Sequence, residues 1–136
     1  HTPNVPSMYG FSYTLPGKTT CPNFIVAGVG DLRSGGVGPE FSIRYGETTP
    51  DAIREKSLFV MNGVGKMIAA MGASWADVTG CNYYATHAMD EALHRELLVP
   101  MGAAGALGMT WFYVKPPVTI MELEIDARSV SAEIVI

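Results

Sequence analysis

The sequence predicts an α+β fold in which helices cover one face of a β-sheet. Three observations predict it. A long amphipathic helix is expected in the middle of the chain, and several short segments alternate apolar and polar residues with the period of two that is typical of strands. The two kinds of segment follow one another in the order β-β-β-α-β-α-β-β, which favours helices that bury their apolar stripes against one sheet.

The first third of the chain is expected to supply three strands. Residues 11–15 alternate and end at a Pro-Gly pair, and the apolar residues 23–30 are typical of a buried strand, so the two segments predict a hairpin. Residues 34–39 are interpreted as a loop because of their glycine content. Residues 41–45 alternate again and predict a third short strand.

The long helix carries clear signals at both ends. Thr49 is a good N-cap, Pro50 suits the first helical position, and Asp51 lies where the helix dipole favours an acid. Gly72 is expected to end the helix as its C′ residue, after about six turns. The residues predicted to face the core recur at helical spacing: Ile53, Val60, Val64, Ile68 and Met71, with Phe59, Met61 and Met67 widening the stripe.

The second half of the chain alternates shorter elements. Residues 74–77 form a capping-box pattern that opens a single turn, and residues 78–86 predict a strand. A second helix is expected over residues 89–98. The Gly- and Ala-rich residues 102–108 match no phosphate-loop pattern and are interpreted as a flexible connection, so a nucleotide site is not expected. Residues 110–114 predict the penultimate strand.

The final predicted strand, residues 117–126, places three carboxylates on one face. Its period of two points Thr119, Met121, Leu123 and Ile125 towards the core and Val118, Ile120, Glu122, Glu124 and Asp126 the other way. A carboxylate beside apolar neighbours can acquire a raised pKa and handle protons or water. The alternative is that these acids form the solvent face of an antiparallel strand.

Size and composition limit the possible functions. The 136 residues predict a single domain, with an N-terminal arm over residues 1–9 and a terminal extension over residues 128–136 that extends the sheet or reaches a neighbouring subunit. Hydrophobic residues make up 48% and charged residues 16%, so we expect apolar surface to be hidden in an oligomer. The net charge of −4 is the wrong sign for a nucleic-acid binder.

Cysteine usage and hydropathy indicate the cell compartment. Two cysteines are too few for a disulfide scaffold and have no metal-ligand spacing, which favours a cytoplasmic protein without a metal. No apolar run reaches the roughly 20 residues of a membrane span, so no membrane partner is expected. Cys81 lies in a predicted strand and is interpreted as an inert buried thiol.

Three segments resemble the Rid superfamily, the reactive intermediate deaminases also known as the YjgF family. These segments are residues 23–28, residues 54–86, within which residues 70–79 carry a Gly-Ala-Ser-x-x-Asp-Val pattern, and residues 121–124. The resemblance covers most of residues 10–127. It implies a chorismate-mutase-like mixed sheet with two helices on one face, and a homotrimer with clefts between neighbouring subunits.

The resemblance also implies a chemistry that needs no cofactor. In similar proteins a Glu at the position of Glu122 holds a water that attacks an imine or enamine tautomer, which releases ammonia and leaves a 2-oxo acid. A backbone group near Gly28 and an aromatic hydroxyl, here most nearly that of Tyr13, help to line the cleft. The partners implied are a small-molecule ligand and further copies of the chain.

The chain departs from the family at the group that binds the substrate carboxylate. Active imine deaminases carry an Arg at the start of the penultimate strand, where its planar fork makes two parallel hydrogen bonds. Counting back from Glu122 places Leu107 there, and no Arg or Lys lies between Arg95 and Lys115. Arg95 is a candidate replacement, although an exposed pair with Glu91 at i,i+4 explains it as well.

The sequence therefore predicts an enamine or imine deaminase, a hydrolase that acts on a small unsaturated amino acid at clefts between subunits. One alternative is a deaminase of an aminomuconate-like intermediate of aromatic degradation, because a longer diacid needs a different anchor from a short one. Another is a non-catalytic small-molecule-binding or chaperone-like trimer. His87 is interpreted as a surface or cap residue, and His94 as a general base only if it faces the cleft.

Overall fold

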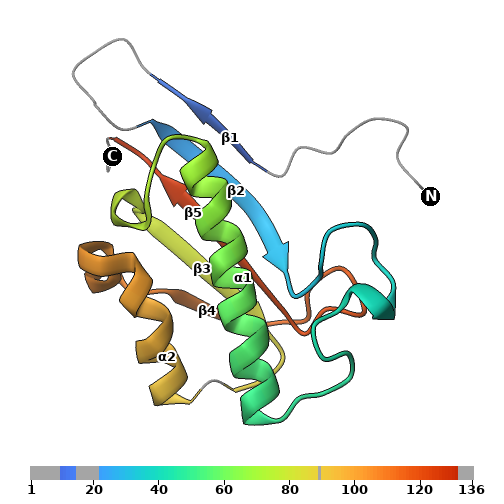
Figure 1. The fold of residues 1–136 in the computed structure, drawn as a ribbon. Coiled ribbons are helices and arrows are strands. Elements are labelled where there is room, and N and C mark those ends of the chain that lie inside the picture. Colours follow the sequence, from blue (N-terminus) through green and yellow to red (C-terminus); the bar gives the residue numbers. More distant parts are fainter. Residues whose placement is uncertain (1–9, 15–21, 89, 132–136) are drawn as a thin grey trace.

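The computed structural model describes residues 10–14, 22–88 and 90–131. Five strands form one sheet in the order β1-β2-β5-β3-β4: β1 (Gly10–Tyr13), β2 (Asn23–Gly30), β3 (Gly80–Ala85), β4 (Thr110–Tyr113) and β5 (Leu123–Ser129). Strand β4 runs parallel to β3, whereas the other neighbours are antiparallel. Two α-helices, α1 (Pro50–Ala70) and α2 (Glu91–Leu98), lie side by side on one face (Figure 1). The predicted α+β fold with a mixed sheet is confirmed.

Helix α1 begins and ends at the residues that the sequence indicates. The side chain of Thr49 accepts a hydrogen bond from the backbone N–H of Ala52, and Pro50 opens the helix. Gly72 follows the helix with φ +78°, a conformation that a Cβ disfavours. The face towards the sheet is buried over most of the predicted stripe: Ile53, Val60, Met61, Val64 and Ile68.

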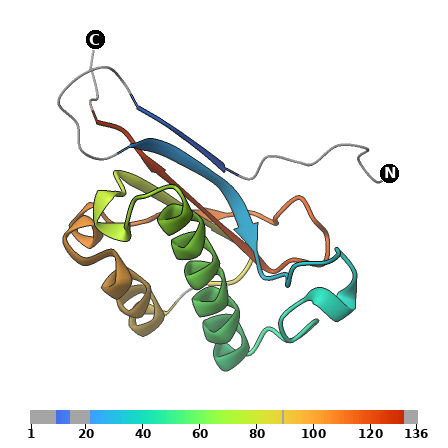
Figure 2. The same ribbon diagram turned by 45° about the horizontal axis from the view of Figure 1, so that its top comes forward.

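Strand β5 lies in the centre of the sheet, and the predicted phase of its side chains is confirmed from Leu123 onwards. Leu123 and Ile125 are buried in the core under the helices, whereas Glu122 and Glu124 are half-buried on the opposite face. Thr119, which the pattern points towards the core, is exposed, because the chain has not yet entered the strand there. The turned view in Figure 2 shows that the described chain places no helix on that opposite face. We call it the open face of the sheet. The three acids of the sequence pattern therefore all lie on the open face.

The bounds of β5 differ from the prediction. The strand begins at Leu123 rather than at residue 117 and continues to Ser129. Its start is delayed because Pro116 and Pro117 cannot donate to a strand ladder, and the chain turns before it enters the sheet. The first residues of the predicted terminal extension thus belong to the sheet, while residues 132–136 and the predicted arm at residues 1–9 lie outside the described residues.

One other predicted segment is wrong. Residues 41–45 form no strand; a 3₁₀ turn (Pro39–Phe41) leads into turns, and the contact is a single bridge between Leu32 and Ser42. The backbone of Arg44 has φ +48°, which is incompatible with an extended strand. The predicted connection after α2 contains 3₁₀ turns over Val99–Leu107, with a kink at Gly102.

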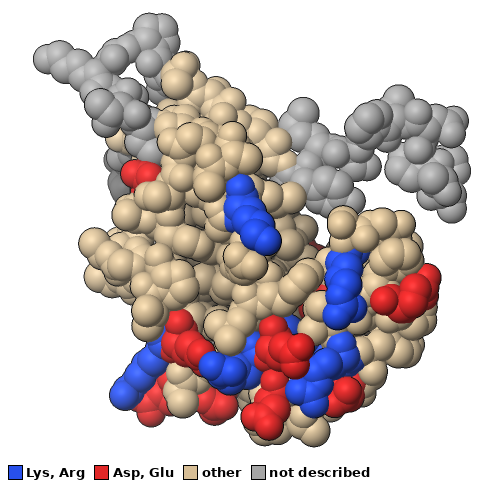
Figure 3. Space-filling view, viewed as in Figure 1, with Lys and Arg blue, Asp and Glu red and all other residues tan. Residues whose placement is uncertain are grey.

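Surface charges gather at one end of the helical side of the molecule (Figure 3). The guanidinium of Arg54 on α1 donates to both carboxylate oxygens of Glu96 on α2, at 2.7 and 2.5 Å. Such exposed pairs stabilise a fold by about 0–1 kcal/mol. Acids and bases alternate in this region, so this face offers no continuous basic surface.

Candidate active site

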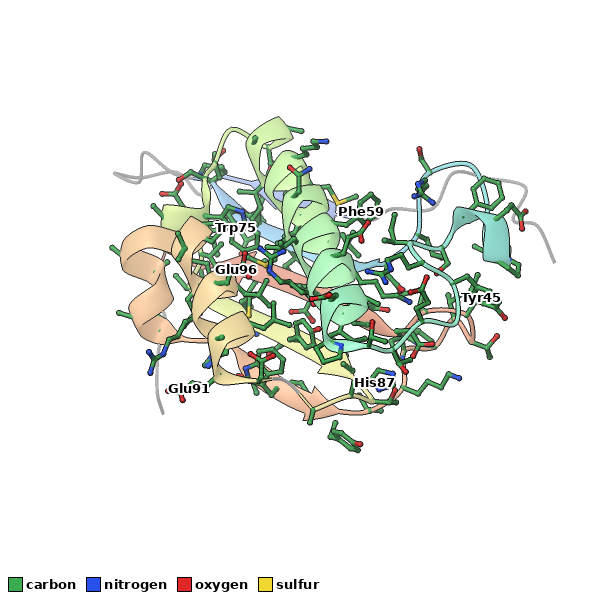
Figure 4. All side chains as sticks on the ribbon, turned by 60° about the horizontal axis from the view of Figure 1, so that its bottom comes forward. Tyr45, Phe59, Trp75, His87, Glu91 and Glu96 are labelled. Atoms are coloured by element: carbon green, nitrogen blue, oxygen red, sulfur yellow. The ribbon has the colours of Figure 1, made fainter. Side chains whose placement is uncertain are left out.

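A glutamate and a histidine form a pair at one end of the sheet. Oε2 of Glu122 lies 2.8 Å from Nε2 of His87, and the two side chains are only 23% and 29% exposed. Glu122 immediately precedes β5 and His87 follows β3. The register of these strands pairs Leu123 with Ala85 and so brings the two side chains together. His87 is labelled in Figure 4.

The backbone of Glu122 is anchored to a buried ion pair. Its N–H donates to Oδ1 of Asp31 at 3.1 Å, and Oδ2 of Asp31 lies 3.2 Å from Nζ of Lys56 on α1. The side chains of Asp31 and Lys56 are fully buried. Breaking such a pair leaves an uncompensated charge in the interior, so the pair holds the start of β5 firmly against the helix layer.

Glu124 is the acid whose titration is altered. Burial, and to a smaller extent the nearby Asp126, raise the pKa of Glu124. Its carboxylate lies over Gly28 in β2, where a Cβ would come within 1.5 Å of Oε1. Gly28 is therefore required for the close approach of this carboxylate, and the structure places Gly28 on the same face as the three acids.

Asp126 is occupied by two hydrogen bonds. It accepts from Nδ2 of Asn82 at 2.9 Å and from the hydroxyl of Tyr84 at 2.7 Å. Burial, together with Asp126, raises the pKa of Tyr84 to about 12, and the ring of Tyr84 stacks on Phe112 with centroids 5.0 Å apart. This acid is thus structurally engaged, whereas Glu122 keeps one carboxylate oxygen for other partners.

A pocket of about 430 Å³ opens between the start of α2 and the end of β4. Its walls are mainly aromatic and include His87, Asp90, His94, Trp111, Phe112 and Tyr113. The imidazole of His94 meets the indole of Trp111 edge-on, with ring centroids 5.4 Å apart. Because His87 lines the pocket and also contacts Glu122, it connects the pocket with the half-buried carboxylate.

Comparison with known proteins identifies the family. The family described as 2-aminomuconate deaminase CnbZ matches residues 1–134. The chain is a member of the CnbZ family. A curated relative, 2-amino-5-chloromuconate deaminase from Comamonas testosteroni, is 35% identical over 138 residues that cover 98% of this chain and 54% of the relative. The chain thus spans about half the length of that relative.

The fold of this CnbZ family member is that of YjgF. The crystal structure of the YjgF gene product from E. coli matches with a TM-score of 0.54 and 14% identity, and the match covers 96% of this chain and 91% of that chain. At this identity the likeness concerns the fold. Together with the family match, it confirms the predicted membership of the Rid superfamily.

Three of the predicted site residues lie away from Glu122 in this CnbZ family chain. Tyr13 is paired with Asn23 at the other end of the sheet, roughly 25 Å along the strands from Glu122. Leu107 is 66% exposed and precedes the start of β4, whereas the pocket lies at the end of that strand. Arg95 is exposed on α2, pairs with Glu91 and is not among the residues that line the pocket.

Other chemistries find no support in the described residues. The described part of the chain contains no group of three His, Cys, Asp or Glu side chains that could hold a metal ion. No helix within residues 10–14, 22–88 and 90–131 is long and apolar enough to cross a membrane. Cys81 is buried, and burial raises the pKa of its thiol to about 12, which makes it a poor nucleophile.

Sequence reasoning missed three residues of this site. The interpretation of His87 as a surface or cap residue is wrong, because it is half-buried and bonded to Glu122. Asp31 and Lys56 were not predicted at all. Lys56 did carry a signal, because it lies between Ile53 and Val60 on the inward stripe of α1, where an unpaired lysine is unfavourable and a buried acid partner is required.

Proposed function

We propose that this protein is a deaminase that hydrolyses the imine tautomer of a 2-aminomuconate-like enamine acid to a 2-oxo acid and ammonia. Membership of the CnbZ family supports the reaction, and the half-buried pair of Glu122 and His87 beside an aromatic pocket is the observation that carries it. Of the activities that the sequence predicts, the aminomuconate type is the one that the names of the family and of the Comamonas relative favour.

Glu122 is the group proposed to activate water. The His87 side chain contacts one oxygen of its carboxylate, and the bond from its own N–H to Asp31 holds its backbone in place. In the proposed step the carboxylate accepts a proton from water while the water oxygen bonds to the imine carbon. Positioned proton transfer of this kind accelerates reactions by about 10²–10⁴-fold.

The proposal includes assembly as a homotrimer. Large apolar side chains are exposed on the open face of the sheet, including Phe11, Ile25 and Phe112 at 42–45% exposure, and a covered face would remove this surface from water. A cleft that contains both Glu122 and Tyr13 also requires a neighbouring copy, because one chain holds them far apart. A sedimentation measurement checks the assembly, and a dilute monomer would contradict it.

The substrate carboxylates need an anchor that this chain does not place in the pocket. Among the described lining residues of the pocket no Arg or Lys occurs. We propose that the anchor is contributed across the subunit contact, where charged side chains of another copy approach the open face. A cytoplasmic location, which the cysteine content predicts, belongs to the same proposal.

Ammonia release tests the proposed function. Purified protein is given a 2-aminomuconate or, separately, 2-aminoacrylate generated in place, and ammonia is measured against time. We expect release from the aminomuconate, about 10²-fold or more slower in Glu122→Gln and unchanged in the control Glu47→Gln, which alters an exposed acid that pairs with Arg44. No release combined with a ligand-induced rise in melting temperature would instead favour a non-catalytic binding trimer.

A further inference from the structure

We infer that His87 is a second catalytic residue, which passes protons between Glu122 and a planar conjugated substrate whose carbon chain lies in the pocket between α2 and β4. This inference rests on the proposed deaminase function. It gives His87 a role in proton transfer and places the unreactive carbon chain of the substrate in the pocket.

The two ring nitrogens of His87 have different surroundings. Nε2 lies 2.8 Å from a carboxylate oxygen of Glu122, and because an ionised carboxylate only accepts hydrogen bonds, Nε2 carries the hydrogen. Nδ1 has no hydrogen-bond partner in the part of the chain that the structure describes, while the ring lines the pocket. An imidazole placed in this way can take a proton on one nitrogen and release one from the other.

His94 also lines the pocket but is less suited to this role. Its Nε2 is buried and finds no partner among the described residues, and its ring meets Trp111 edge-on. No carboxylate contacts it in the described part of the structure, so it has no route for a proton to Glu122. His87 is the histidine that joins the pocket to the acid.

The walls of the pocket suit a flat, unsaturated carbon chain. Trp111, Phe112 and Tyr113 present aromatic surface, and a volume of about 430 Å³ is within the range of small-molecule sites, about 300–1,000 Å³. A three-carbon enamine has no chain to place against these rings, whereas a conjugated six-carbon acid has one.

The proton steps balance without an oxidant or a cofactor. The water oxygen forms a bond to the carbon of the protonated imine as Glu122 takes a water proton. Glu122 then gives this proton to the substrate nitrogen, and the electron pair of the breaking carbon–nitrogen bond leaves with ammonia. The hydroxyl proton passes to the free Nδ1 of His87 as the 2-oxo group forms, while the Nε2 proton moves to Glu122 through the 2.8 Å contact. Proton exchange with water restores both side chains, so the protonated imine and water give the 2-oxo acid, ammonia and one proton.

Two variants of His87 test the inference on the full-length chain. His87→Gln keeps a hydrogen-bond donor for Glu122 but cannot relay a proton, and we expect kcat for ammonia release from an aminomuconate to fall about 10²-fold with little change in KM. His87→Ala should lose as much and recover in part, in a concentration-dependent way, when imidazole is added. Lys66→Gln, an exposed change on α1, is the matched control and should behave as wild type.

A substitution at Tyr113 tests where the carbon chain of the substrate lies. Tyr113 is 79% exposed, so Tyr113→Ala should fold normally. We expect it to lower kcat/KM for the conjugated substrate but not for 2-aminoacrylate. Wild-type activity in His87→Gln, or no imidazole rescue of an impaired His87→Ala, overturns the inference and leaves the proposed function intact. An absence of ammonia release from the wild-type protein overturns both.

Discussion

The two faces of the sheet differ in the side chains that they carry and in how far those side chains are buried. On the helix-covered face Tyr83, Leu123 and Ile125 are at most 1% exposed and pack into one apolar core. On the open face Glu122, Glu124 and Asp126 are half-buried among polar partners, and large apolar side chains remain exposed. One face thus stabilises the chain by itself, whereas the other carries the proposed catalytic acid and is covered by another copy in the proposed trimer.

The two faces are connected at one point. Lys56 reaches from α1 through the helix layer to Asp31, and Asp31 accepts the N–H of Glu122 on the first residue of the acidic pattern. The core therefore fixes the position of the proposed catalytic carboxylate. Substitutions at this connection and on each face separately show how strongly it contributes to stability.

The largest expected effect is at the connection itself. Lys56→Met leaves Asp31 charged and unpaired in the interior, and we expect the free energy of unfolding in urea to fall by about 3–5 kcal/mol. The double variant Asp31→Asn, Lys56→Met removes both charges while an amide oxygen can still accept from Glu122, so most of the loss should be recovered. A single variant as stable as the wild type would show that the pair does not hold the fold.

Adjacent tyrosines on opposite faces provide a matched comparison. The hydroxyl of Tyr83 lies 2.8 Å from that of Ser57 in the core, whereas the hydroxyl of Tyr84 donates to Asp126 on the open face. Tyr83→Phe should lower the free energy of unfolding by about 0.5–1.5 kcal/mol. Tyr84→Phe should cost less, because water can replace its bond at a half-exposed site. If the two variants lost equal free energy of unfolding in urea, the expected difference between the faces would be contradicted.

A smaller effect depends on pH. Because burial raises the pKa of Glu124 in the folded state, the folded protein holds this proton more tightly than the unfolded chain, and stability decreases as pH rises through the folded pKa. Glu124→Gln should therefore stabilise the protein at pH 7, and the difference from wild type should vanish below about pH 4. Glu47→Gln should have the opposite sign at pH 7, because the bond to Arg44 lowers the pKa of Glu47.

The smallest effect is expected at Arg95. Its pair with Glu91 is exposed at i,i+4, so Arg95→Ala should change the free energy of unfolding by about 0.5 kcal/mol or less. The KM for an aminomuconate should also stay the same, because the structure directs Arg95 to its own helix. A marked rise in KM would show instead that Arg95 is the missing carboxylate anchor.

The same contrast explains how much the sequence predicts. Periodicity predicts the helix-covered face well: the cap at Thr49, the stripe of α1 and the inward phase of Leu123 and Ile125 are confirmed. The open face depends on contacts between residues that are far apart in the chain, such as the 35 positions between His87 and Glu122. Local patterns do not record these contacts, so His87 was misread and Asp31 was missed.

The prediction of a strand at residues 41–45 is wrong for a related reason. Its alternation of apolar and polar residues is real, but the positive φ of Arg44 and Gly46 turns the chain away from the sheet edge. The loop buries the adjacent residues Ser42 and Ile43 and leaves Tyr45 exposed, so burial in it does not follow the alternation of apolar and polar residues. Short alternating segments therefore need a partner strand before they predict a sheet.

The central claim, that the two faces divide stability and chemistry, is tested most directly by ammonia release per folded molecule in two variants. Ile68→Ala empties part of the core, because Ile68 is fully buried on α1, and should cost about 2–5 kcal/mol while keeping the wild-type rate under conditions where it is folded. Glu122→Gln should keep the wild-type free energy of unfolding and lose about 10²-fold or more in rate. An active Glu122→Gln protein would contradict the account.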